Sequence, residues 1–193
     1  LQQTLSTQLS PEALTATDLN GDGRTDLAVA NFRSDSVTTL TQLASGGFQT
    51  AHFQLNSNGS SDVNGPDAIA AGQLNDDNAD GVIDNADLVD LVVASLNSNN
   101  ISVLLGNAQN GFDVQSPTRF NQLPPAESTP GFGSSLVLGQ FNDDDVLDLA
   151  VTNSTDILLT IATGKGDGSF GVSSTVALDT EADDIAIGDL NGD

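Results

Sequence analysis

The sequence lacks several residue types on which catalytic and structural sites commonly depend. Its 193 residues include no Cys, Met, Trp or Tyr and a single His, His52. Without Cys, disulfides and thiol catalysis are excluded. Lys and Arg together number 4, against 27 Asp and Glu, so no basic surface can neutralise nucleic-acid phosphates. No apolar run approaches the roughly 18 residues of a membrane span. We therefore expect no nucleic-acid partner and no membrane insertion in this segment.

Acidic residues are what the sequence has in abundance, and nearly all of them are Asp. The formal net charge is −23, and the exceptions to Asp are Glu12, Glu127 and Glu181. The Asp residues stand beside the strand-like runs "DLAVA", "DLVDLVVA" and "DLAVT". A disordered acidic tail would avoid such apolar runs. Short groups of Asp between strands favour cation binding over a purely solubilising role.

The chain also contains an internal repeat. The stretches "TDLNGDGRTDLAVAN", "GQLNDDNADGVIDNADLVDLVVAS" and "GQFNDDDVLDLAVTN" align, and "GDLNGD" begins a fourth copy. Asp18 and Asp26 are 8 positions apart, whereas Gln73 and Asp90 are 17 apart, so the second acidic loop is longer by nine residues. After each full copy come a second apolar run and a Gly-containing turn. Each of these turns leads to a Phe, at Phe48, Phe112 and Phe170.

Each repeat is predicted to form short strands joined by turns rich in Gly, Asn and Asp. No stretch shows an amphipathic helical period. The strands are expected near residues 13–18, 26–31, 36–42, 48–55, 67–73, 90–95, 101–105, 112–120, 135–140, 148–152, 157–162 and 170–178. Four-stranded antiparallel units repeating every ~50 residues are typical of β-propeller blades. The predicted fold is all-β, with three complete blades plus partial ones.

The repeat boundaries predict how the 193 residues are divided. The expected parts are an outer strand of a preceding blade (1–10), three blades (11–57, 65–123 with the enlarged loop, and 131–179) and the start of a further blade (180–193). We expect these parts to belong to one partial propeller domain, a fragment of a larger ring of about seven blades. The competing hypothesis is that neighbouring subunits supply the missing strands by edge pairing.

The pattern "DLNGDGRTDLAVAN…SVTTL…GGF" resembles the FG-GAP repeat, also called the VCBS or integrin-α-type repeat. The resemblance covers nearly the whole chain and is strongest in residues 13–55. It implies a calcium-binding β-propeller of the kind found on cell surfaces and in secreted proteins, so we expect an extracellular or cell-surface location.

The first acidic loop predicts a cation site. Alternate positions put oxygen atoms on one side of a tight turn, and Gly23 permits a left-handed backbone there. A cage of hard oxygens suits Ca²⁺ better than Mg²⁺, which keeps its waters. The alternative is a hairpin turn rich in Asn, Asp and Gly that holds no metal. The predicted ligands are the side chains of Asp18, Asn20, Asp22 and Asp26 and the carbonyl of Arg24.

The second loop has the spacing of an EF-hand loop, with Asp in place of the final Glu. Gly81 stands at the sixth position. The predicted ligands are Asp76, Asn78, Asp80, the Val82 carbonyl, Asp84 and Asp87. The loop also resembles one half of a dockerin, a cohesin-binding module. Because it runs directly into "DLVVAS", which continues the blade strand, an enlarged calcium loop is favoured over a docking module.

The third loop departs from the pattern, and we expect it to bind calcium more weakly. Gln140 replaces the first Asp, and Asp145 replaces the Gly. The predicted ligands there are Gln140, Asn142, Asp144, Val146 and Asp148, and those of the incomplete fourth loop are Asp189, Asn191 and Asp193. Two to three calcium ions are expected in all.

No catalytic constellation is predicted. His52 should point outward from an outer strand, and Lys165 lies in a hairpin turn without the features of a phosphate loop. The prediction is therefore a non-catalytic, calcium-binding extracellular repeat protein that acts in adhesion or as a surface scaffold, with a protein or glycan ligand. Two alternatives stay open: the propeller portion of a secreted polysaccharide-acting enzyme, and a calcium-dependent self-assembling subunit that binds copies of itself.

Overall fold

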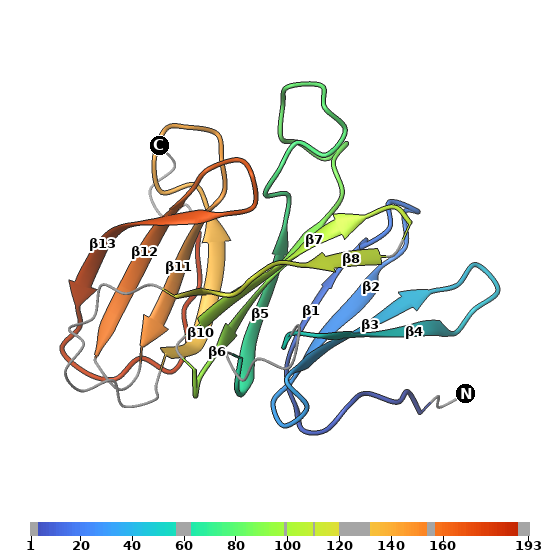
Figure 1. Ribbon diagram of the computed structural model, residues 1–193, viewed down its shortest axis with the longest axis horizontal. Helices are drawn as coiled ribbons and strands as arrows, with labels where there is room; N and C mark the ends of the chain where they lie inside the picture. The colour runs from blue at the N-terminus through green and yellow to red at the C-terminus, as the bar shows by residue number, and fades with distance from the viewer. Residues whose placement is uncertain are drawn as a thin grey trace.

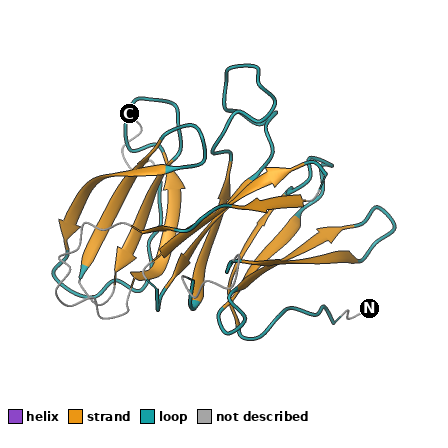
Figure 2. Ribbon diagram, viewed as in Figure 1, coloured by secondary structure: helices purple, strands orange, loops and turns teal. Residues whose placement is uncertain are grey.

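The computed structural model describes residues 4–56, 63–98, 100–109, 111–119, 132–153 and 157–188. Within these ranges every regular element is a β-strand, and no helix is present (Figure 2). The described residues accordingly include no helix long and apolar enough to cross a membrane. The predicted all-β class is confirmed.

The strands form three antiparallel sheets in which consecutive strands are neighbours. The first sheet contains β1 (Pro11–Thr17), β2 (Asp26–Asn31), β3 (Ser36–Gln42) and β4 (Phe48–Gln54). The second contains β5 (Pro66–Gly72), β6 (Asp90–Ser95), β7 (Asn100–Asn107), β8 (Gly111–Val114) and the short β9 (Thr118–Arg119). The third contains β10 (Phe132–Gly139), β11 (Asp148–Asn153), β12 (Leu158–Gly164) and β13 (Phe170–Ala177). The four-stranded repeat unit is therefore confirmed.

The outer strand of the second sheet differs from the prediction. Instead of one strand over 112–120, β8 and β9 both pair with β7, at opposite ends of it. Pro117 lies between them and has no backbone N–H to donate to the ladder. The ladder is therefore interrupted at this point.

The three sheets are arranged as a fan (Figure 1). The first strands of the sheets lie along its inner side, and β5 contacts both β1 and β10. In the second sheet, alternate residues of β6 face opposite ways, so Leu91 and Val93 pack toward the first sheet while Val92 and Ala94 pack toward the third. Both faces of this sheet are buried, which explains the continuous apolar run "DLVVA".

The side chains between the sheets form two apolar clusters. Phe112 of the second sheet meets Phe53 of the first edge to face, with ring centroids 5.4 Å apart and an interplanar angle of 86°. Phe170, the equivalent of Phe112, is buried in the cluster between the second and third sheets. Phe112 and Phe170 thus pack between adjacent sheets. The acidic loops emerge from one edge of the fan (Figure 1).

Candidate functional site

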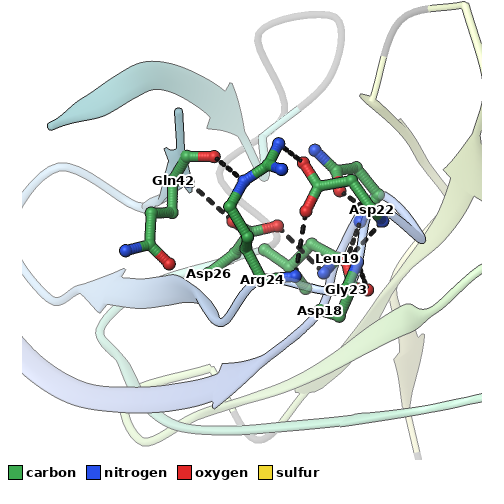
Figure 3. A network of polar contacts seen from close by, with 8 residues as sticks. Asp18, Leu19, Asp22, Gly23, Arg24, Asp26 and Gln42 are labelled. Atoms are coloured by element: carbon green, nitrogen blue, oxygen red, sulfur yellow. Dashed lines mark hydrogen bonds and ion pairs between the residues drawn. The ribbon is translucent and has the colours of Figure 1, made fainter. Parts of the chain in front are cut away.

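The first loop is organised by hydrogen bonds from its own backbone (Figure 3). The Asp18 carboxylate accepts the N–H groups of Asn20, Asp22 and Gly23 at 3.3, 3.1 and 2.6 Å. Asn20 Oδ1 accepts the Asp22 N–H at 3.1 Å, and Asp22 Oδ1 accepts the Arg24 N–H at 3.0 Å. Side-chain oxygens at alternate positions are thereby fixed around a single turn. Gly23 takes the left-handed conformation that this turn requires, with φ +81°.

Electrostatics in this loop favour the ionised form of Asp18. Desolvation raises its pKa. The backbone hydrogen bonds from Gly23, Asp22, Asn20 and Gly21 together lower the pKa by more than this, so it lies below the ordinary value. The Arg24 guanidinium forms an ion pair with the Asp22 carboxylate and donates through Nε to the Gln42 carbonyl at 3.0 Å (Figure 3). One positive group is therefore already placed against the loop carboxylates.

Asp26 ends the first loop and begins β2, and its side chain is fully buried. Oδ2 accepts the Leu19 N–H at 3.0 Å, and Oδ1 accepts the Gln42 N–H at 2.7 Å. The carboxylate therefore ties the start of the loop to the end of β3. We call a residue in this role a clamp aspartate.

The other two sheets contain equivalent clamp aspartates. Asp90 accepts the N–H groups of Leu74 and Gly106, both at 2.7 Å. Asp148 accepts those of Phe141 and Gly164, both at 2.9 Å. Asp26 and Asp148 were predicted as calcium ligands and Asp90 was not. The sequence analysis missed the clamp role, although an Asp before the second strand of every repeat, even behind the enlarged loop, was its signal.

The electrostatic surroundings of Asp90 differ because the enlarged loop lies next to it. Burial raises its pKa to about 6, although the backbone hydrogen bonds from Gly106 and Leu74 oppose this. The neighbouring carboxylates of Asp77 and Asp87 add to the rise. The ionised form of Asp90 is therefore less favoured than that of an exposed Asp.

The enlarged loop repeats the hydrogen bonds of the first loop. Asp76 accepts the N–H groups of Asp80 at 3.1 Å and Gly81 at 2.8 Å. Asn78 Oδ1 accepts the Asp80 N–H at 2.9 Å, and Asp80 Oδ1 accepts the Val82 N–H at 2.9 Å. Positions 1, 3 and 5 of the two loops are therefore built in the same way.

The rest of the enlarged loop closes around Asp87. This side chain is 5% exposed and accepts the N–H groups of Asp77, Asn78 and Asp84 at 3.1, 3.2 and 2.9 Å. Asp84 Oδ1 accepts the Ala86 N–H at 2.7 Å. Asp87 therefore holds the two ends of the loop together, and its role as a calcium ligand stays a prediction, as does that of Asp84.

The third loop keeps only part of this network. Asn142 Oδ1 accepts the Asp144 N–H, and Asp144 Oδ1 accepts the Val146 N–H, both at 3.0 Å. Gln140 is exposed, and among the described residues its side chain takes no part in the network. Asp145 stands where the other loops have Gly and has φ +61°, in the left-handed region.

In the described ranges no group of three or more His, Asp or Glu side chains is arranged to hold an ion. The predicted fourth site, Asp189, Asn191 and Asp193, lies outside the described residues. The first and enlarged loops each bring the side chains of positions 1, 3 and 5 onto one turn, whereas in the third loop only those of positions 3 and 5 share this network.

A cavity between the first two loops could not be found from the sequence. It has a volume of about 390 Å³ and is lined by residues of both loops, among them Asp18, Gly21, Gln73 and Asp87. It arises because adjacent sheets place two loops side by side, which no local pattern reveals.

The two side chains considered for catalysis are both exposed. His52 lies on β4, the outermost strand of its sheet, with Nδ1 2.9 Å from Thr38 Oγ1. Lys165 lies in the turn between β12 and β13. Neither contributes to the acidic loops.

Antiparallel four-stranded sheets stacked as a fan, with an acidic loop after each inner strand, define a protein of the β-propeller type. Residues 10–39 match the FG-GAP repeat family, so the resemblance is confirmed over the first acidic loop and its strands. Comparison with curated protein sequences gave no match.

The fold also resembles that of a solved structure, the periplasmic gluconolactonase PpgL of Pseudomonas aeruginosa. The TM-score is 0.54 at 14% identity, and the match covers 90% of this chain and 41% of that one. At this identity the likeness shows the fold alone. The chain thus spans less than half the length of the structure it matches.

Proposed function

We propose that the first and enlarged loops bind Ca²⁺ and that the chain is a non-catalytic, calcium-binding repeat protein of an extracellular adhesive or scaffolding system. The observation that carries this proposal is the shared hydrogen-bond pattern of the two loops. In each, a carboxylate at position 1 accepts the N–H groups of positions 5 and 6, at Asp18 and at Asp76. Unrelated turn sequences have no reason to share this arrangement.

The donor set fits a hard divalent cation. It consists of carboxylate, amide and carbonyl oxygens, the ligands that Ca²⁺ prefers. The Asp22 carboxylate of the first loop lies beside one positive group, the Arg24 guanidinium. Bound calcium would offset the mutual repulsion of the loop carboxylates. The ligands we assign are Asp18, Asn20, Asp22 and Arg24 in the first loop, Asp76, Asn78, Asp80, Val82, Asp84 and Asp87 in the second, and more weakly Gln140, Asn142, Asp144 and Val146 in the third. The buried Asp26 and Asp148, which the sequence also offered as ligands, are assigned to the clamp role instead.

The position of the acidic loops on one edge of the fan supports an adhesive or scaffolding role (Figure 1). Calcium would stiffen the loops, which then present neighbouring residues to a protein or glycan ligand, or to copies of the chain. The FG-GAP match and the periplasmic location named for the structural neighbour support an exported setting. The strongly acidic composition, with a net charge of −23, is consistent with a partner recruited through calcium.

Calorimetric titration of the 193-residue chain with Ca²⁺ tests the proposal. We expect at least two sites, with dissociation constants of order 10⁻⁴–10⁻³ M as in extracellular modules, and weaker binding of Mg²⁺. Asp18→Ala and Asp76→Ala should each remove one site. Asp179→Ala, at an exposed Asp outside the loops, is the matched control and should leave the titration unchanged. A flat titration, or equal loss in the control, would refute the proposal.

A further inference from the structure

Three asparagines occupy position 3 of the three described loops, and they differ in the residue that follows. Asn20 precedes Gly21, Asn78 precedes Ala79, and Asn142 precedes Asp143. All three side-chain oxygens accept the N–H two residues further on, at 3.1, 2.9 and 3.0 Å. The loops therefore share this hydrogen bond and differ in the chemistry open to their asparagines.

An asparagine before glycine is chemically reactive. The backbone nitrogen of the following residue can attack the side-chain carbonyl carbon, forming a cyclic succinimide and releasing ammonia. Water then opens either carbonyl of the ring, giving aspartate or isoaspartate. Glycine favours the attack because no Cβ hinders its nitrogen and its backbone reaches the required conformation at little cost. Ala79 and Asp143 each add a side chain that hinders the same step.

The surroundings of Gly21 leave this reaction sterically open. Asn20 and Gly21 are both exposed, and a Cβ built on Gly21 would meet no atom within 4 Å. The restraint comes from the loop itself, because Asn20 Oδ1 is held by the Asp22 N–H. The Asp18 carboxylate fixes that same N–H at 3.1 Å. The side chain has to leave these hydrogen bonds before its carbonyl can be attacked.

A second Asn–Gly pair within the described residues shows the opposite situation. The Gly65 N–H donates to Asp35 Oδ1 at 3.0 Å. A Cβ on Gly65 would lie 2.7 Å from the ring of Phe32, so the segment is closely packed. Asn64 Oδ1 also accepts Asn97 Nδ2 at 3.2 Å. Packing therefore protects Asn64, whereas Asn20 depends on the closure of its loop.

We propose that Asn20 is a site of spontaneous deamidation whose rate is set by opening of the first loop. Conversion to aspartate turns position 3 from an amide into a carboxylate and adds a fourth acidic side chain to Asp18, Asp22 and Asp26. Conversion to isoaspartate lengthens the backbone by one methylene and breaks the hydrogen-bond spacing of the loop. Effects on calcium affinity rest on the proposed function, whereas the deamidation does not.

Mass spectrometry of the aged, full 193-residue protein tests the inference. Trypsin cuts after Arg24, and residues 1–24 contain Asn20 as their one Asn. We expect the mass gain of amide-to-acid conversion to accumulate at Asn20, with Asn64, Asn78 and Asn142 lagging behind. Asp18→Ala removes the acceptor that fixes the loop and should speed the reaction about tenfold, the factor that corresponds to losing one charged hydrogen bond. Asn20→Gln should abolish the gain in this fragment.

The rate at Asn142 serves as the control for global unfolding, since it lies in the third sheet. No gain at Asn20, equal rates at Asn20 and Asn142, or an unchanged rate in Asp18→Ala would each overturn the inference. Slower deamidation in millimolar Ca²⁺ would support both the inference and calcium binding. Acceleration by Asp18→Ala without any effect of Ca²⁺ would uphold the deamidation site and count against the calcium proposal.

Discussion

The first and third loops share the clamp aspartate but differ in the hydrogen bonds within the loop. Asp26 and Asp148 are both fully buried. Each accepts one backbone N–H from its loop and one from the end of the third strand of its own sheet, β3 or β12. Beyond that point the loops diverge. The Asp18 carboxylate collects three N–H groups, whereas Gln140 collects none among the described residues.

The two loops show that Asp has two different functions in the repeat, which the sequence alone does not distinguish. The clamp aspartate belongs to the fold, since it persists where the rest of the loop has drifted from the repeat pattern. The carboxylate at position 1 belongs to the candidate cation site, since the third loop folds without it.

The largest effect is expected at the clamps. Asp26→Ala and Asp148→Ala should each destabilise the protein by about 2–4 kcal/mol, because each leaves two backbone N–H groups without an acceptor. The two losses should be similar and should persist in EDTA. Urea unfolding of both variants provides the measurement, with Asp143→Ala, at an exposed position of the third loop, as the control. If Asp26→Ala matters only when calcium is present, the clamp is instead a ligand.

How far the sequence predicts the molecule can be judged from the same residues. Strands β2, β3, β6 and β11 follow from β-branched and Leu-rich runs bounded by turns, because local pattern and burial agree there. The repeated Asp before the second strand marks the clamp position in the sequence, but its hydrogen-bond partners do not follow from it, because the position of Gln42 relative to Asp26 is a tertiary property. The inter-loop cavity was hidden for the same reason.

A carboxylate with one buried and unpaired oxygen should behave in the opposite way to the clamps. Asp67 lies in β5, and its Oδ1 is buried without a hydrogen-bond partner. Burial raises its pKa to about 8, and the charge of Glu12 adds to the rise. Because the folded pKa exceeds the unfolded value of 3.8, the protonated group stabilises the fold at low pH, and this stability is lost as the pH rises through about 8.

Asp67→Asn should therefore raise the stability at about pH 9 by about 2 kcal/mol, the cost of an unpaired buried acceptor group. Near pH 4 the gain should vanish, because Asp67 is then neutral. Thermal melts across this pH range measure the difference. Asp148→Asn is the matched comparison and should destabilise at neutral pH. A gain for Asp67→Asn that does not depend on pH would exclude ionisation as the cause.

Position 1 is predicted to control calcium. In 1 mM Ca²⁺ a site of the expected affinity contributes about 1 kcal/mol to stability by mass action, so Asp18→Ala should lower the melting temperature in calcium more than in EDTA. Gln140→Asp gives the third loop the missing carboxylate and should increase its calcium response. Differential scanning calorimetry with and without Ca²⁺ tests both. An equal loss for Asp18→Ala in both conditions would confine that residue to a structural role.

The smallest effect is expected at position 6, where Gly23 has φ +81° and Asp145 has φ +61°. The left-handed conformation costs a residue with a Cβ about 1–2 kcal/mol, and it costs Asp less than most residues. Replacement by Gly removes this cost but also increases the entropy of the unfolded chain, which offsets part of the gain in stability. Asp145→Gly should therefore stabilise the protein by about 0.5 kcal/mol. Asp22→Ala should instead destabilise it, since it removes the acceptor of the Arg24 N–H and a predicted ligand. The Asp145 side chain is exposed and takes no part in the described network. Strong destabilisation by Asp145→Gly would therefore mean that this side chain has a role of its own. The third loop would then not be simply a weakened copy of the first.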